Sequence, residues 1–127
     1  QKSMYSTMKN KEKNMKKLEI SNKKEEISFP ARDLLFITSA DNYIEVHYLQ
    51  NETEQTKLLR GTLKNTKEEL RQFTAFYRCH RAWIVNLDRV DSVIGNSQGY
   101  RLVLQGTEIR VPVSRNLNDE IQTRLAK

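Results

Sequence analysis

The sequence predicts a mostly β domain that contains one short helix between its strands and ends in a second helix. From residue 26 onward, β-branched and aromatic residues alternate with polar residues in short runs, and turn-forming residues separate these runs. The 127 residues suit a single domain with its own hydrophobic core. The sequence has no apolar run of the roughly 18 residues that a membrane-spanning helix needs. We therefore expect a soluble domain.

Residues 1–25 differ in composition from the rest, and we expect them to form a polar, lysine-rich linker or tail. Up to Lys24 the chain holds eight lysines and two glutamates, which account for the whole formal charge of +6. The domain expected over 26–127 is therefore close to neutral, and bulk charge gives no argument that it binds nucleic acid. A sparse amphipathic helix is the alternative for the tail, because its three methionines and Leu18 recur at helical spacing.

The strands follow from short alternating runs along the domain. Before the helix, strands are predicted at 27–29, 33–38, 43–50 and 55–60. After it, strands are predicted at 76–79, 83–86, 90–94, 100–105 and 108–113. Turn residues at 51–54 join two of the early strands into a hairpin, and glycine-containing turns at 96–99 and 105–107 separate the last three.

Each predicted helix shows apolar residues on one face. In the segment 63–73 these are Leu63, Leu70 and Phe73, and Thr62 or Thr66 can cap the start of the helix. In the last segment, Ser114 is the predicted N-cap. The apolar residues that follow it lie four positions apart, at Leu117, Ile121 and Leu125.

The stretch FYRCHRAWIVN, residues 76–86, places Cys79 beside His80 between two apolar runs. Three interpretations of this pair are compared: a nucleophile with its base, half of a metal site, or a basic edge that binds an anion. Neighbouring side chains on a strand point to opposite faces, so Cys79 and His80 diverge. If Tyr77 and Cys79 face the core, Phe76, Arg78 and His80 face outward. We expect a small buried cysteine rather than a nucleophile.

No cofactor or metal site is expected from the sequence. One cysteine and two histidines give no zinc-like spacing, and no acidic cluster resembles a calcium loop. The four isolated glycines form no phosphate-binding loop. A single cysteine cannot form an internal disulfide, which fits a cytoplasmic setting.

Three predicted turns carry side chains that can read DNA. The first has Asn42 and Tyr43, the second His80 and Arg81, and the third Ser114, Arg115 and Asn116. Arginine binds guanine through two hydrogen bonds, asparagine binds adenine in the same way, and hydroxyls or helix N-termini hold phosphate.

Four ordered motifs, together with this pattern, resemble a LytTR domain, the DNA-binding output domain of the LytR/AlgR/AgrA class of bacterial response regulators. The motifs are DLLFITSADNYIEVHY, LLRGTLKNTKEEL, FYRCHRAWIVNLDRVDSV and IRVPVSRNLND, and the resemblance runs from about residue 28 to 125. It implies an elongated antiparallel β-sandwich of small sheets. It also implies binding to successive major grooves through loops, without a recognition helix.

The resemblance also implies roles for individual residues. Arg81 and Arg115 would contact bases or phosphates, and Asn42, Tyr43 and Asn116 would add polar readout or backbone contacts. His80 would either contact DNA or shape its loop. The further phosphate candidates are Lys64, Arg78 and Ser114. A net-neutral domain could still bind DNA if its arginines gather on one edge, away from its carboxylates.

The expected partner is double-stranded promoter DNA, with repeated sites and a dimer on the DNA. Because the chain starts at Gln1, we expect a fragment whose N-terminal receiver, sensor or membrane domain is missing. We expect a two-component transcription regulator and not an enzyme. The alternative is a β-rich protein-interaction or ligand-binding module of a signalling protein, which exposed edge strands or an apolar patch would favour.

Overall fold

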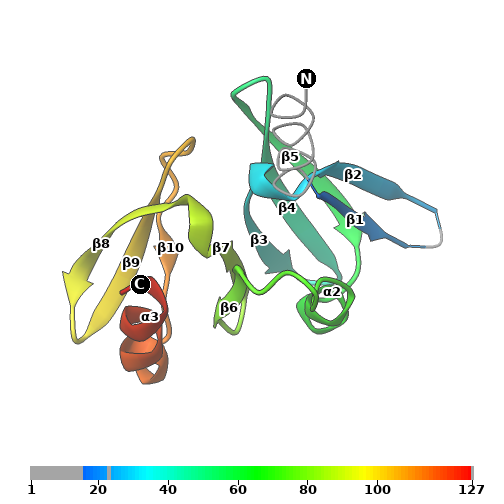
Figure 1. The fold of residues 1–127 in the computed structure, drawn as a ribbon. Helices are drawn as coiled ribbons and strands as arrows, with labels where there is room; N and C mark the ends of the chain where they lie inside the picture. Colours follow the sequence, from blue (N-terminus) through cyan, green and yellow to red (C-terminus); the bar gives the residue numbers. More distant parts are fainter. Residues whose placement is uncertain (1–15, 23, 127) are drawn as a thin grey trace.

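Three antiparallel sheets make up most of the part of the chain that the computed structural model describes, residues 16–22 and 24–126 (Figure 1). The central sheet has five strands in the order β5-β4-β3-β7-β6. Their bounds are Leu34–Ala40 for β3, Tyr43–Gln50 for β4, Thr53–Arg60 for β5, Phe76–His80 for β6 and Trp83–Asn86 for β7. The N-terminal sheet pairs β1 (Lys17–Ser21) with β2 (Glu26–Pro30). The C-terminal sheet has the order β10-β9-β8, with β8 at Val90–Asn96, β9 at Gly99–Leu104 and β10 at Val111–Pro112.

Short helical segments lie between the strands and after the last one. Helix α2 (Leu63–Glu69) follows β5, and α3 (Asn118–Leu125) closes the described chain. Single 3₁₀ turns, η1 (Ala31–Asp33), η2 (Leu87–Arg89) and η3 (Arg115–Leu117), come before β3, β8 and α3. Neither α2 nor α3 is long and apolar enough to cross a membrane, and the same holds for every helix among the described residues.

Strands β3 and β7 of the central sheet are buried on both faces. Successive β3 side chains point to opposite sides, so Ile37 enters one apolar cluster and Phe36 the other. The first cluster joins the central sheet to the N-terminal sheet and α2, and its buried members include Leu18, Phe29, Leu63 and Leu70. The second joins it to the C-terminal sheet and α3 through buried residues that include Leu102, Leu104, Val111 and Ile121. This arrangement confirms the predicted mostly β fold of small antiparallel sheets with a C-terminal helix.

Several local predictions are confirmed to the residue. Strands β4 and β7 have the predicted bounds. Thr62 caps α2 by accepting a hydrogen bond from the backbone N–H of Asn65 at 3.2 Å. In the β4–β5 turn, Asn51 and Glu52 have φ values of 53° and 64°, the left-handed pair that a two-residue hairpin turn favours.

The prediction for Phe76 was wrong, and the bounds of several elements differ from the predicted ones. Phe76 is buried in the first cluster while Tyr77 and Cys79 enter the second, because both faces of the sheet are covered. The last predicted strand shortens to Val111–Pro112, and α2 ends at Glu69 rather than 73. The turn η3 separates Ser114 from α3, and the Ser114 side chain makes no capping hydrogen bond.

Strand β1 forms within the segment for which a linker was expected. Leu18 pairs with Phe29 and Ile20 with Ile27, and both β1 side chains are buried. The alternation of Leu18 and Ile20 with charged residues is a strand pattern, which the surrounding lysines obscure in the sequence. Leu18 therefore lies in a strand rather than in the alternative amphipathic helix, whose methionines at 4, 8 and 15 are outside the described residues.

We expect Leu18→Ala to lower the free energy of unfolding by about 2–5 kcal/mol, because it leaves a cavity in the first cluster. Urea unfolding followed by tryptophan fluorescence measures this change. The matched control is Glu19→Ala on the exposed side of the same strand. Equal stability of the Leu18 and Glu19 variants would show that β1 contributes nothing to the core.

Candidate nucleic-acid interface

The first and second predicted turns lie at the same end of the central sheet. The first turn (residues 41–42) joins β3 to β4, and the second turn (residues 81–82) joins β6 to β7. Strands β3 and β7 pair directly, with Thr38 opposite Trp83. The backbone N–H of Ser39 and the hydroxyl of Thr38 both donate to the carbonyl of Ala82, at 3.0 and 2.9 Å. The two turns are therefore tied together by hydrogen bonds.

The third turn (residues 114–117) is brought to the same end by the second cluster. The backbone N–H of Ser114 donates to the carbonyl of Cys79 at 2.9 Å, one residue before the end of β6. A fourth turn (residues 97–98), between β8 and β9, lies beside it: Asn118 Nδ2 donates to the Ser97 carbonyl at 3.1 Å. We call this end of the molecule the turn edge; it runs along the lower side of Figure 1.

The first turn presents Asn42 and Tyr43 to solvent. Asp41 adopts φ 59°, a left-handed conformation that aspartate tolerates better than most residues. The carbonyl of Asn42 accepts a hydrogen bond from Gly61 at 2.9 Å, which fixes the turn to the end of β5. Tyr43 is 38% exposed, and the guanidinium of Arg60 lies over its ring at 5.3 Å. Arg60 was not among the predicted site residues.

The second turn is shaped by Arg78 and His80 and leaves Arg81 exposed. Arg78 Nη2 donates to the carbonyl of Arg81 at 2.7 Å. His80 Nδ1 accepts from the backbone N–H of Ala82 at 3.1 Å, which requires Nδ1 to be unprotonated. His80 is thus engaged within the loop, and Arg81 is the exposed side chain of the turn.

The other predicted residues lie on the turn edge as well. Arg115 and Asn116 are exposed in η3, and Ser114 before them is half-buried. Arg115 Nη1 lies 3.5 Å from Gln98 Oε1 of the fourth turn, a second residue that the sequence did not single out. Lys64 is exposed in the first turn of α2, four residues after Arg60 at the end of β5.

Charge is only partly segregated along the molecule. The turn edge carries Arg60, Lys64, Arg81 and Arg115, but Asp41 is exposed in its first turn. At the opposite end of the central sheet, Glu52 in the β4–β5 turn and Asp88 in η2 are exposed. The cations of the turn edge are three arginines and one lysine, and they do not form a general basic surface. Asp119 and Glu120 are exposed at the start of α3, and Arg32 is exposed at the opposite end.

Cys79 is a buried packing residue. It has no exposed surface, and its Sγ lies 3.4 Å from the carbonyl of Pro112. Burial raises the pKa of the thiol to about 12. A nucleophile needs the opposite shift, because the thiolate is the reactive form.

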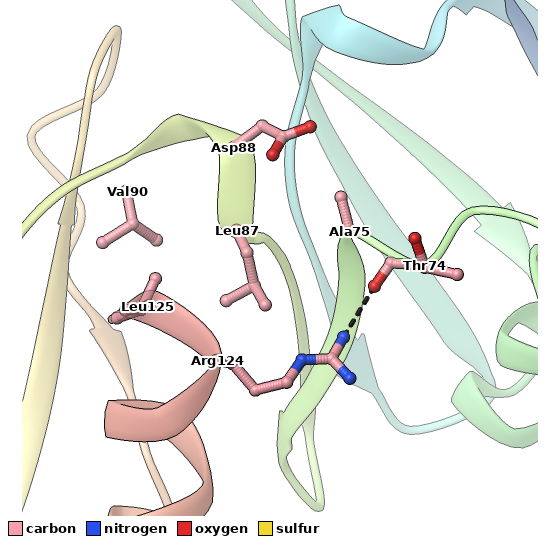
Figure 2. Close-up of a pocket in the computed structure, with 7 residues that line it drawn as sticks. All are labelled: Thr74, Ala75, Leu87, Asp88, Val90, Arg124 and Leu125. Atoms are coloured by element: carbon pink, nitrogen blue, oxygen red, sulfur yellow. Dashed lines mark hydrogen bonds between the residues drawn. The ribbon is translucent and has the colours of Figure 1, made fainter. Parts of the chain in front are cut away.

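A cavity of about 580 Å³ lies away from the turn edge, between η2, the start of β6 and the end of α3 (Figure 2). Arg124 lines this cavity, and its Nη2 donates a hydrogen bond to the carbonyl of Thr74 at 2.6 Å. Its lining includes Leu87, Asp88 and Leu125, and no histidine or cysteine. Among the described residues no group of histidine, cysteine and acidic side chains could hold a metal ion.

Comparison with known proteins points to one family. A model of the LytTr DNA-binding domain matches residues 24–126. The chain is 36% identical to the sensory transduction protein LytT of Oceanobacillus iheyensis over 74 residues, 57% of the chain and 28% of that protein. It is 30% identical to an uncharacterized response regulatory protein of Vibrio cholerae over 98 residues, 76% of the chain and 37% of that protein. The chain therefore spans well under half the length of either relative.

A solved structure has the same fold. The LytTr DNA-binding domain of a Bacillus cereus protein superposes with a TM-score of 0.68 and 21% sequence identity, over 87% of this chain and 97% of that one. Strand β1 precedes the first residue of the family match.

We expect Cys79 to resist Ellman's reagent in the folded protein near pH 8. A pKa of about 12 leaves only about one thiol in 10⁴ ionised at that pH, and burial blocks access. Denaturant restores the pKa to the ordinary range, so the thiol should then react within the mixing time. Fast reaction of the folded chain would contradict the buried assignment.

We expect His80→Ala to lower the free energy of unfolding by about 0.5–1.5 kcal/mol, because the Ala82 N–H loses its acceptor. His80→Asn should recover part of this loss, since the amide oxygen can occupy the place of Nδ1. Thermal unfolding of the two variants measures the difference. Equal stability of both variants and the wild type would show that the histidine does not shape the turn.

Proposed function

The chain belongs to the LytTR family of DNA-binding domains, and from this membership we propose that it is the sequence-specific output domain of a bacterial transcription regulator. The observation that carries the proposal is the turn edge. It gathers Asn42, Arg81, Arg115 and Asn116, the side chains suited to base recognition, from segments far apart in the sequence.

DNA would be read by turns rather than by a recognition helix. Helix α3 has eight residues and buries Ile121 in the second cluster, and α2 has seven and buries Leu63 and Thr66. Each is about two turns long or less, which leaves little free helix for the major groove. The turns project beyond strand ends that pairing keeps rigid. Because the first and second turns are tied together, they would enter one major groove as a unit. Turns farther along the edge would enter the next major groove on the same face of the duplex.

Each turn would have its own role. Arg81 and Arg115 are exposed and would contact bases or phosphates, with polar readout or backbone contacts from Asn42, Tyr43 and Asn116. Lys64, Arg78 and Ser114 would contact phosphates. His80 would act by holding the second turn in shape, because its Nδ1 accepts from the backbone of that turn.

The biological partner would be promoter DNA with repeated sites, bound by two copies of the chain. The named relatives are a sensory transduction protein and a response regulatory protein, and the chain matches only 28% and 37% of their lengths. This fits an output domain joined to a receiver, sensor or membrane domain and working in the cytoplasm.

A second candidate function is protein interaction through β5. This strand is the edge of the central sheet, it has eight residues, and Leu58 on it is 51% exposed. An exposed edge strand can add a strand from a partner. Substitution of Leu58 by Lys would weaken such pairing, and binding to DNA at the turn edge would be unaffected.

We expect Arg81→Ala and Arg115→Ala each to weaken binding to a selected duplex by about 1–3 kcal/mol if the arginine makes a bidentate base contact. The duplex is obtained by selection from a random pool with the wild-type chain. Arg32→Ala is the matched control, because Arg32 is exposed in η1 at the opposite end of β3. No enrichment of any sequence and no binding at low salt would overturn the proposed function.

A further inference from the structure

The end of β5 carries an arginine that is held in place on the turn edge. Arg60 lies directly opposite Tyr43 in the β4–β5 pairing. Its guanidinium carbon is 5.3 Å from the centre of the Tyr43 ring, and its Nη2 donates to the tyrosine hydroxyl at 3.4 Å. Arginine on an aromatic face is attracted by the ring electrons. The contact therefore restricts a side chain that would otherwise sample many rotamers.

The backbone around Arg60 is fixed from both sides. Its carbonyl accepts a hydrogen bond from Asn22 Nδ2 at 3.1 Å, in the turn between β1 and β2. The next residue, Gly61, donates to the carbonyl of Asn42 at 2.9 Å. Two hydrogen bonds therefore hold this strand end beside the first turn: the backbone bond from Gly61 to Asn42, and the side-chain bond from Arg60 to Tyr43.

A cleft of about 510 Å³ lies beside this pair, between it and the β1–β2 turn. Among the described residues its lining includes Asn22, Lys24, Glu25, Tyr43 and Arg60, two cations and one carboxylate. Arg60 and Lys24 are exposed. Arg60 can bind an anion in this cleft, because the guanidinium has four further N–H donors besides the one on Tyr43.

We propose that Arg60 is a further DNA-contacting residue, which binds a backbone phosphate beside the first turn while Tyr43 positions it. The proposal rests on the proposed function. Arg60 precedes Gly61 at the strand end and is set back from the tip at 41–42, so it faces the rim of a groove that the tip enters. Phosphates form that rim, and the planar guanidinium matches them. Tyr43 thereby acts through Arg60, and this positioning role replaces the polar readout proposed for Tyr43 above.

Because Tyr43 already holds Arg60 in place, this single cation can contribute to DNA binding even though the domain has little net charge. A free arginine loses rotamer entropy when it binds phosphate, and stacking on Tyr43 has already removed part of that freedom. Lys24 on the neighbouring turn adds a second charge to the same cleft, while Glu25 offsets one of the two. The phosphate contact therefore depends on Arg60 and on the ring that holds it.

The test measures the salt dependence of binding. Fluorescence anisotropy with a selected duplex of about 30 base pairs, roughly three helical turns, is recorded from about 50 to 200 mM salt. Arg60→Gln should reduce the slope of log affinity against log salt by about one and weaken binding roughly 3- to 10-fold at the middle of that range. Arg60→Lys should restore most of the slope, because it restores the charge. Arg32→Gln, at the other end of the sheet, should match the wild type.

A double-mutant cycle tests the positioning role of Tyr43. Tyr43→Leu should weaken binding when Arg60 is present and have little further effect in the Arg60→Gln background. Thermal unfolding of each variant shows that the domain remains folded. A slope and affinity of Arg60→Gln equal to those of Arg32→Gln would overturn the proposal, and equal effects of Tyr43→Leu in both backgrounds would overturn the positioning role. Failure of the wild type to bind any duplex would instead overturn the proposed function itself.

Discussion

The pairing of β3 with β7 is the contact on which the arrangement of the turns depends. It joins residues more than 40 positions apart, with Phe36 opposite Val85 and Ile37 opposite Ile84. At the far end, the buried side chain of Asn86 donates to the carbonyl of Leu34 at 2.9 Å, and at the turn edge Thr38 donates to Ala82 at 2.9 Å. Because two hairpins meet along this antiparallel pairing, their turns emerge at the same end. A one-residue shift in register would move the buried side chains to the other face.

The apolar clusters on the two faces of the central sheet bring further turns to this edge. On one face, the first cluster holds the N-terminal sheet, whose turn reaches the carbonyl of Arg60 through Asn22. On the other face, the second cluster holds the C-terminal sheet and α3, and so brings Arg115 next to β6. The first three turns carry exposed polar residues, yet each adjoins a strand that contains buried residues. Rigid scaffolds that position loops are a common way to build binding surfaces.

The sequence predicted elements well where the chemistry is local and less well where tertiary packing decides. The alternation of apolar and polar residues and the turn residues predicted the bounds of β4 and β7. The capping residue Thr62 predicted the start of α2. Phe76 was misplaced because a half-exposed strand and a strand buried on both faces cannot be told apart from one short run. The predicted contact residues stay predictions, although all of them lie on the turn edge. Arg60 and Gln98 were missed because their significance comes from pairing partners far away in the sequence.

The most direct test of the turn edge as the DNA-binding surface is a titration of the ¹⁵N-labelled chain with a selected duplex, followed by backbone amide shifts. The account predicts that the largest changes fall on the four turns, at positions such as Asn42, Arg81 and Arg115. Residues at the opposite end, such as Asn51 and Asp88, should change little. Large shifts confined to that opposite end, or to β5 around Leu58, would contradict the account.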